Sequence, residues 1–112
     1  LDTVLTMISD DRAEKAVEYC RDQAAELGRL RGEKDYLELR LKVVKGQVFL
    51  TASGTVAERQ AVAECHPDVI VLIGRYRDVV TEYTTLQAML KGAELTVDVW
   101  RSQAASLRRG NI

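Results

Sequence analysis

Residues 50–68 read LTASGTVAERQAVAECHPD, and this stretch interrupts a sequence that otherwise repeats in steps of three and four residues. Gly54 can adopt the positive φ that many tight turns require. Thr55 followed three positions later by Glu58 is a capping box, which predicts that a helix begins directly after Thr55. The stretch therefore predicts a turn and then a short helix over about 56–65.

The sequence before this stretch has the pattern of one long amphipathic helix over about 10–50. Ser9 is a favourable N-cap, and the two aspartates after it lie where the helix dipole favours negative charge. Gly28 and Gly32 lower the helix propensity, which predicts a bend or a soft point over 28–34. The apolar stripe of this helix, with one lysine in it, consists of Ala13, Val17, Cys20, Ala24, Leu27, Leu30, Lys34, Leu37, Leu41, Val44 and Val48.

The sequence after the stretch repeats this pattern. Proline restricts the residue before it to extended backbone and suits the first turn of a helix. Pro67 therefore ends the short helix and begins a last helix over about 67–108, with Gly110 as the expected stop. The apolar stripe of this helix consists of Val69, Ile73, Tyr76, Val80, Tyr83, Leu86, Leu90, Ala93, Val97, Trp100, Ala104 and Leu107.

These elements predict an all-α fold: an antiparallel hairpin of two long amphipathic helices with a short connector helix, packed in a coiled-coil-like way. We expect residues 10–109 to form one helical hairpin domain. Residues 1–9 are expected to form an N-terminal arm or a short helix.

Each long helix carries more apolar side chains than a two-helix seam can bury, among them Leu39, Val71 and Leu95. We therefore expect a homo-oligomer, with a four-helix dimer as its smallest form. Alternatively, the N-terminal arm and the short helix cover the excess within one monomer. The residues expected to pack in the seam or the oligomer are Leu37, Leu41, Val44, Ile73, Tyr76, Val80, Tyr83, Leu90 and Trp100.

The composition excludes several classes of protein. With 46% hydrophobic and 29% charged residues, the chain is too apolar for a disordered protein. Only 5% of the residues are aromatic, which excludes a binding surface on which nucleic-acid bases stack on many aromatic rings. No apolar run approaches the roughly 18–20 residues of a membrane span, and no signal peptide is recognisable. The two cysteines make no disulfide framework, so we expect a cytoplasmic protein without a membrane partner.

No constellation of residues predicts catalysis, a metal or a cofactor. His66 is the only histidine and lies beside Cys65, whereas a structural zinc site needs four ligands. No carboxylate pair lies in an apolar setting, and no Ser/His/Asp arrangement or glycine-rich phosphate loop is visible. We therefore expect a non-enzymatic protein.

The sequence predicts one basic cluster at the turn end of the hairpin. An antiparallel fold is expected to bring basic residues of the two long helices level with each other, beside an arginine of the short helix. The cluster consists of Arg40, Lys42, Lys45, Arg59, Arg75 and Arg77. Oligomerisation would multiply its charge, so that a chain of net charge −1 could bind a polyanion such as single-stranded DNA. Against this, Asp68 and Asp78 lie in the same region and could neutralise it through surface ion pairs.

A second segment of interest is Trp100-Arg101-Ser102-Gln103. Trp100 falls on the apolar stripe, where it is expected to be a packing anchor. Arg101 and Gln103 are then expected to project from the edge of the seam and to remain available to a partner.

The connector Gly54…Ala57-Glu58-Arg59, the proline at the start of the last helix and the Trp100-Arg101-Ser102-Gln103 segment resemble small bacteriophage proteins encoded near recombination and replication genes. The resemblance covers roughly residues 12–109. It implies an accessory role in single-strand DNA annealing or replication through protein partners, and it brings no catalytic residues.

Two functions are therefore expected. The first is a phage-type accessory protein of DNA recombination or replication that self-associates in the host cytoplasm. It would contact single-stranded DNA or a recombination partner through the basic cluster. The alternative is a structural or scaffolding coiled-coil oligomer that binds only proteins.

Overall fold

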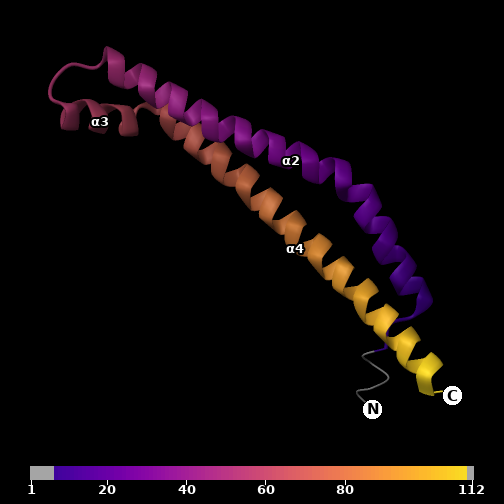
Figure 1. Cartoon of the computed structure of the whole chain (residues 1–112). Helices are drawn as coiled ribbons and strands as arrows, with labels where there is room; N and C mark the ends of the chain where they lie inside the picture. The colour runs from indigo at the N-terminus through magenta and orange to yellow at the C-terminus, as the bar shows by residue number, and fades with distance from the viewer. Residues whose placement is uncertain (1–6, 111–112) are drawn as a thin grey trace. The chain divides into compact units, whose positions relative to one another are not determined.

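The computed structural model describes residues 7–110, and these residues form three helices and no strand (Figure 1). The helices are α2 (Asp10–Thr51), α3 (Val56–Cys65) and α4 (Pro67–Gly110). The described residues are 92% helical, which confirms the predicted all-α class. Within the expected arm or short helix over 1–9, residues 7–9 are not helical, and residues 1–6 lie outside the described residues.

The start of α3 has the predicted N-cap at Thr55, and Glu58 closes it through the Thr55 hydroxyl and not through the Thr55 backbone N–H. The backbone N–H of Glu58 donates to Thr55 Oγ1 at 3.2 Å, and the Thr55 hydroxyl donates to Glu58 Oε1 at 3.2 Å. Gly54 has a φ of 110°, a left-handed conformation that side chains disfavour. His66 has extended backbone, with φ −64° and ψ 135°, so α3 ends before Pro67.

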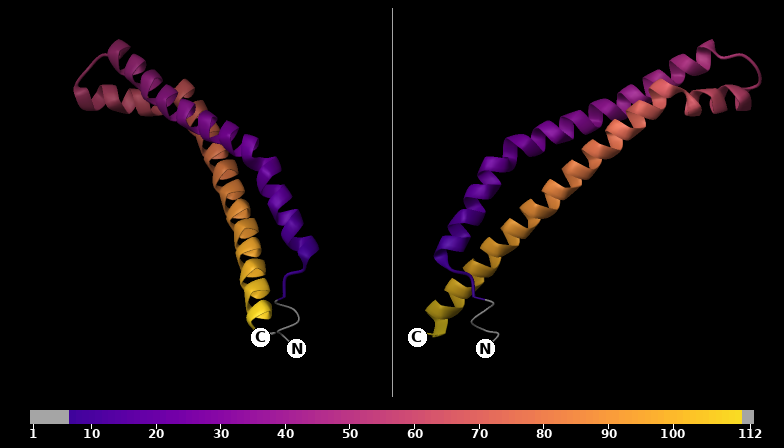
Figure 2. Two further views of the ribbon diagram at one scale, coloured as in Figure 1. Left: turned by 45° about the vertical axis from the view of Figure 1, so that its right-hand side comes forward. Right: turned by 180° about the vertical axis from the view of Figure 1, so that it is seen from behind.

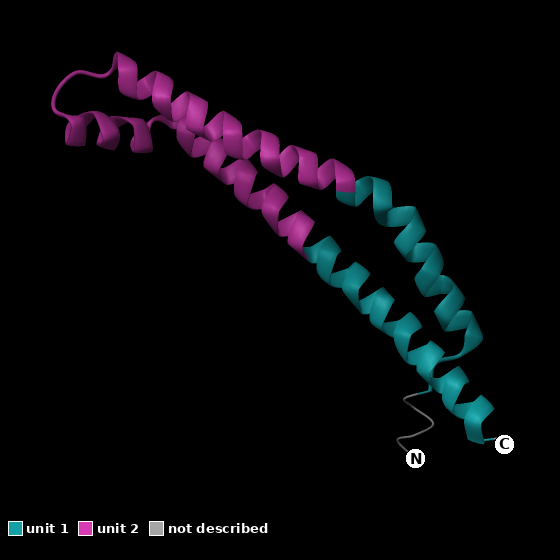
Figure 3. Ribbon diagram, viewed as in Figure 1, with its two compact units in different colours: residues 1–27, 85–112 teal, residues 28–84 magenta. Residues whose placement is uncertain are grey.

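The chain divides into two compact units (Figure 3). Unit 1 comprises Leu1–Leu27 and Thr85–Ile112, and unit 2 comprises Gly28–Thr84. Within α2 the division falls between Leu27 and Gly28, where the sequence predicts a soft point because of its two glycines. α2 is helical on both sides of this division.

In unit 2, the second half of α2 runs antiparallel to the first part of α4, and α3 lies beside the end of α2 (Figure 2). Seven-residue spacing places Leu30, Leu37 and Val44 on one side of α2, and all three are buried. Leu37 and Val69, which lies on α4, are the two fully buried large side chains of the described residues. Burying a side chain of this size stabilises the fold by about 1.5–3 kcal/mol. Ala63 of α3 is also buried.

In unit 1, the first part of α2 runs antiparallel to the last part of α4, and polar contacts supplement a small core (Figure 2). Its buried hydrophobic residues are Ala13, Leu86 and Leu90. The backbone N–H of Ile8 donates to Gln103 Oε1 at 2.9 Å, and Gln103 Nε2 donates to the Ile8 carbonyl at 3.2 Å. The expectation that Gln103 remains available to a partner is therefore wrong, because both ends of its amide are used within the unit.

The predicted packing residues fall into three groups. Leu37, Val44, Tyr83 and Leu90 are buried, and Leu41, Tyr76, Val80 and Trp100 are half-buried. Four members of the predicted stripes are exposed instead: Ala24, and Val17, Ile73 and Leu107 with exposed fractions of 43%, 43% and 59%. Ile73 lies at the edge of the α4 stripe, and the neighbouring Leu72 is the more buried of the two. A strict three- and four-residue pattern therefore includes residues beyond the reach of a single partner helix.

Candidate interaction surfaces

The face of α2 that points away from the unit 2 core carries a row of apolar and small residues. Residues two positions apart on a helix point about 200° apart. Leu37 is accordingly fully buried, whereas Leu39 is 63% exposed. We call this row the outer α2 stripe, and it consists of Gly32, Tyr36, Leu39, Val43, Gly46 and Leu50.

Most of the outer α2 stripe is uncovered within unit 2, and Gly46 borders the shallow hollow between α2 and α3. Tyr36 is 57% exposed and Leu50 is 75% exposed, the largest fraction among the exposed large hydrophobic residues described. A Cβ atom added at Gly32 or Gly46 would meet no other atom within 4 Å. Along this side of the helix, three large side chains therefore lie between two glycines, and Leu50 follows the second glycine.

Unit 1 has an apolar surface of its own. Leu95, Val99 and Leu107 on α4 border a shallow hollow of about 450 Å³, together with Met7. Each of these four side chains is at least 43% exposed. Exposed apolar surface is therefore present in both units.

Arg59, the predicted basic residue of α3, is held within unit 2. Its Nε atom donates to the Phe49 carbonyl at 3.1 Å, and its guanidinium carbon lies 4.5 Å from the centroid of the Phe49 ring. This hydrogen bond and cation–π contact join α3 to the end of α2. The Arg59 side chain therefore stabilises the packing of α3 against the end of α2.

At Arg75, the contact between the two long helices is with an acidic residue and not with the predicted basic cluster. Arg75 Nη2 donates to Glu33 Oε1 at 3.4 Å, so the Arg75 side chain is paired with a carboxylate of α2. Arg40 is seven residues further along α2, which is about 10 Å at 1.5 Å per residue. The expected cluster assumed that the end of α2 faces the start of α4, whereas the end of α2 contacts α3 through Phe49.

The remaining basic residues do not share one face. Arg40 and Lys42 are two positions apart and point about 200° apart on α2, and the same holds for Arg75 and Arg77 on α4. Arg77 also lies 3.8 Å from Asp78, as the neutralising alternative predicts. The six basic residues are therefore dispersed and partly paired with carboxylates.

Three members of the predicted cluster have no hydrogen bond or ion pair to any described residue. They are Arg40, Lys42 and Lys45. Arg40 and Lys42 are exposed, whereas Lys45 is half-buried and borders a shallow hollow between α2 and α3, beside Gln60 and Glu64. Arg40 and Lys42 are thus the exposed members without an ion-pair partner among the described residues.

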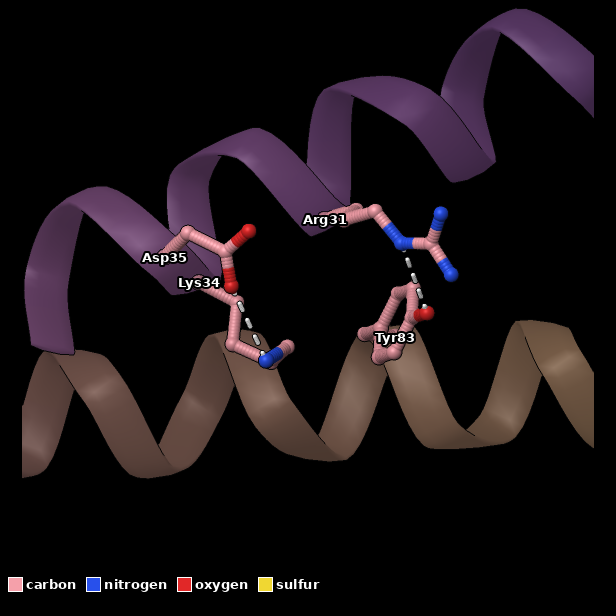
Figure 4. Close-up of polar contacts among 4 residues, drawn as sticks. All are labelled: Arg31, Lys34, Asp35 and Tyr83. Carbon is pink, nitrogen blue, oxygen red and sulfur yellow. Dashed lines mark hydrogen bonds and ion pairs between the residues drawn. The ribbon is translucent and has the colours of Figure 1, made fainter.

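A polar group that the sequence did not predict bridges α2 and α4 in unit 2 (Figure 4). Arg31 Nε donates to the Tyr83 hydroxyl at 3.2 Å, and Lys34 Nζ lies 5.7 Å from the centroid of the Tyr83 ring. Lys34 Nζ also donates to Asp35 Oδ1 at 3.1 Å. The sequence signal for this group was Lys34 in the apolar stripe of α2. A lysine can pack its aliphatic stem against apolar residues while its amine reaches polar partners.

The contacts of this polar group stabilise the packing of α2 against α4. The hydrogen bond to Asp35, helped by its negative charge, raises the pKa of Lys34 above its ordinary value. A nucleophilic lysine instead requires a lowered pKa, because only the neutral amine attacks. Lys34 therefore stays charged and serves to join the helices.

Trp100 is anchored in unit 1 as the sequence predicts for a packing residue. It is half-buried, and its indole Nε1 donates to Asp10 Oδ1 at 2.7 Å. Arg101, beside it, is exposed and lies 4.0 Å from Asp98. Of the Trp100-Arg101-Ser102-Gln103 segment, the first and last residues are therefore used within the unit.

Residues 7–110 contain no group of three or more His, Cys, Asp or Glu side chains that could hold a metal ion. The ring of His66 instead accepts the backbone N–H of Asp68 at Nδ1, 3.1 Å away. Over the same residues, no helix combines the length and apolar character that crossing a membrane requires.

Comparison with known proteins gives no relative from which a role could be transferred. No protein-family model, curated protein or solved structure matches this chain. The roles of these surfaces are accordingly inferred from exposure, contacts and charge.

Proposed function

We propose that this chain is a non-enzymatic helical protein that self-associates and serves as a structural or scaffolding unit for protein assembly. The observation that carries this proposal is the balance of buried and exposed apolar side chains. Among the described residues, nine hydrophobic residues are buried, whereas fifteen large hydrophobic residues are at least 42% exposed. Contiguous apolar surface on a monomer commonly marks an association site.

The distribution of this surface favours assembly through helix packing. The outer α2 stripe in unit 2 and the Leu95 and Val99 surface in unit 1 both follow a helix face. Helices that meet along such faces pack as bundles or coiled coils. Cys20 and Cys65 are free thiols, which fits the expected reducing cytoplasm.

Sedimentation equilibrium over a wide concentration range tests the proposal. We expect a mass that rises above the 12.5 kDa of one chain and changes little with salt, because apolar burial carries the association. A mass of 12.5 kDa at every concentration would refute it.

A second candidate function is binding of single-stranded DNA within a phage-type recombination or replication assembly. The observation that favours it is that Arg40 and Lys42 are exposed and have no ion-pair partner among the described residues. The resemblance of the connector and the Trp100 segment to phage proteins agrees with it. The dispersal of the other basic residues makes it second to protein assembly.

Fluorescence anisotropy with a labelled single-stranded oligonucleotide tests this candidate. The double variant Arg40→Glu/Lys42→Glu is compared with Lys91→Glu/Arg101→Glu, which changes the net charge equally in unit 1. If Arg40 and Lys42 contact phosphates, the first variant should reduce the slope of log K against log salt concentration by about 0.7 for each lost contact. Equal effects of both variants, or no binding at low salt, would eliminate this function.

A further inference from the structure

The outer α2 stripe has the spacing of a coiled-coil seam. Its six residues, from Gly32 to Leu50, are separated by steps of four, three, four, three and four. Any two successive steps add up to seven residues, the heptad repeat that keeps a stripe facing a partner along a supercoiled helix. The stripe is therefore suited to a second helix rather than to a compact ligand.

We propose that the outer α2 stripe binds the same stripe of a second copy of this chain, with the two α2 helices antiparallel and a two-fold axis near residue 41. This pairing presupposes the self-association proposed as the function. It adds the surface, the orientation and the register of the contact.

The sizes of the residues along the stripe are complementary in this orientation. Facing layers that combine large with small side chains interdigitate without voids or strain. With the axis near residue 41, residue numbers in facing positions add up to 82, so every residue of the stripe has a counterpart. The layers, with the second member in the second copy, are Gly32 with Leu50, Tyr36 with Gly46, and Leu39 with Val43.

A parallel pairing of the same stripe packs poorly. It places Gly32 against Gly32 and Gly46 against Gly46, which leaves voids, because neither residue of such a layer has a side chain. It also places Tyr36 against Tyr36, which crowds two large rings in one layer. The positions of the two glycines therefore favour the antiparallel pairing, which places each glycine opposite a large side chain.

The charges beside the stripe agree with the antiparallel pairing. Asp35 and Lys42 are seven residues apart and lie on the same flank of the stripe. The Asp35 side chain is 63% exposed, and Lys42 is exposed without an ion-pair partner among the described residues. With the axis near residue 41, Lys42 of one copy lies level with residue 40 of the other, about 7.5 Å along the helix from Asp35, which is within the reach of a lysine side chain.

The first arm of the test is a matched pair of lysine substitutions in the full chain, measured by sedimentation velocity. Leu39→Lys places a charge at the centre of the stripe. Val71→Lys places a charge on α4, outside the stripe, at a residue of similar exposure: Val71 is 61% exposed and Leu39 is 63% exposed. We expect Leu39→Lys to raise the dissociation constant of the dimer at least about 30-fold, as for a central interface residue. Val71→Lys should leave it within about threefold, as for a residue outside the interface.

The second arm tests the register by exchanging sizes. Gly32→Leu should weaken the dimer at least about tenfold by overpacking against Leu50, although leucine improves the helix propensity of α2. Adding Leu50→Ala to Gly32→Leu should restore the dissociation constant to within about threefold of the original. Circular dichroism shows whether each variant keeps its helix content.

The outcomes separate this pairing from the proposed function. A dimer that survives Leu39→Lys leaves self-association standing but overturns the pairing through the stripe. A loss of dimer in Gly32→Leu that Leu50→Ala does not restore overturns the antiparallel register. A wild-type chain that is monomeric at every concentration overturns both the proposed function and the pairing.

Discussion

Leu37 and Leu39 are separated by one residue, yet the structure predicts that truncating them has very different effects. Leu37 is fully buried, whereas Leu39 is 63% exposed. Leu37→Ala removes the buried apolar atoms and leaves a cavity in the unit 2 core, which should lower the free energy of unfolding by about 2–5 kcal/mol. Leu39→Ala removes atoms that are mostly in water, so its cost in the monomer should stay below about 1 kcal/mol.

Urea unfolding followed by circular dichroism at 222 nm measures both effects. Each variant is compared with the original chain at a low concentration, about 2 μM, and at one about a hundredfold higher, because association stabilises by mass action. Leu37→Ala should shift the midpoint strongly at both concentrations. Leu39→Ala should shift it more at the higher concentration, where the proposed dimer contributes.

Two results would refute this reasoning about the faces of α2. One is a loss below about 1 kcal/mol for Leu37→Ala, which is outside the range for buried leucines. The other is an equal loss for Leu39→Ala at the low concentration, which would place Leu39 in the core of the monomer.

Further predictions concern single contacts. Gly54→Ala should lower the free energy of unfolding by about 1 kcal/mol or more, because φ is 110° there. Gly74→Ala, in the open interior of a helix, should raise it by about 0.5–1 kcal/mol, and thermal melts of both variants check the sign. Trp100→Phe removes the hydrogen bond to Asp10 and should cost about 1 kcal/mol in urea unfolding; no change would show that the bond does not contribute. The raised pKa of Lys34 stabilises the fold below the ordinary lysine pKa, and this stability is lost as the pH rises through the higher folded-state value. Between about pH 9.5 and 11.5 the original chain should therefore lose more stability than Lys34→Met, and parallel losses would contradict this.

The local elements of the fold were predictable because their signals are local. The capping box at Thr55 and the proline at residue 67 each act on a few neighbouring residues. The helix bounds in the structure accordingly lie within two residues of the predicted ones. No comparable local signal fixes which residues of two helices lie level with each other.

The register of α2 and α4 depends on how the connector packs. Arg31 and Glu33 bond to α4 well before α2 ends at Thr51. The end of α2 contacts α3, through Phe49 and Arg59. The sequence did not predict the pairing of Arg75 with Glu33, because it joins side chains far apart in the sequence.

The dispersal of the basic residues, by contrast, follows from helix geometry alone. Arg40 and Lys42 cannot share one side of a helix, since they differ by two positions. The same rule separates Leu37 from Leu39 and identifies the outer α2 stripe once the buried face is known. The bond between Gln103 and the backbone of Ile8 had no such signal, because any exposed polar residue near a chain terminus could make it.

The division into units has a consequence for the order of folding. Unit 2 is one continuous segment, Gly28–Thr84, whereas unit 1 joins segments from the two ends of the chain. Contacts such as that between Ile8 and Gln103 require closure of nearly the whole chain, and closing even the segment between the two parts of unit 1 costs about 3–4 kcal/mol of entropy. Once unit 2 has formed, that segment is already closed. Unit 2 is therefore expected to nucleate folding, and unit 1 to form afterwards at a much smaller entropic cost.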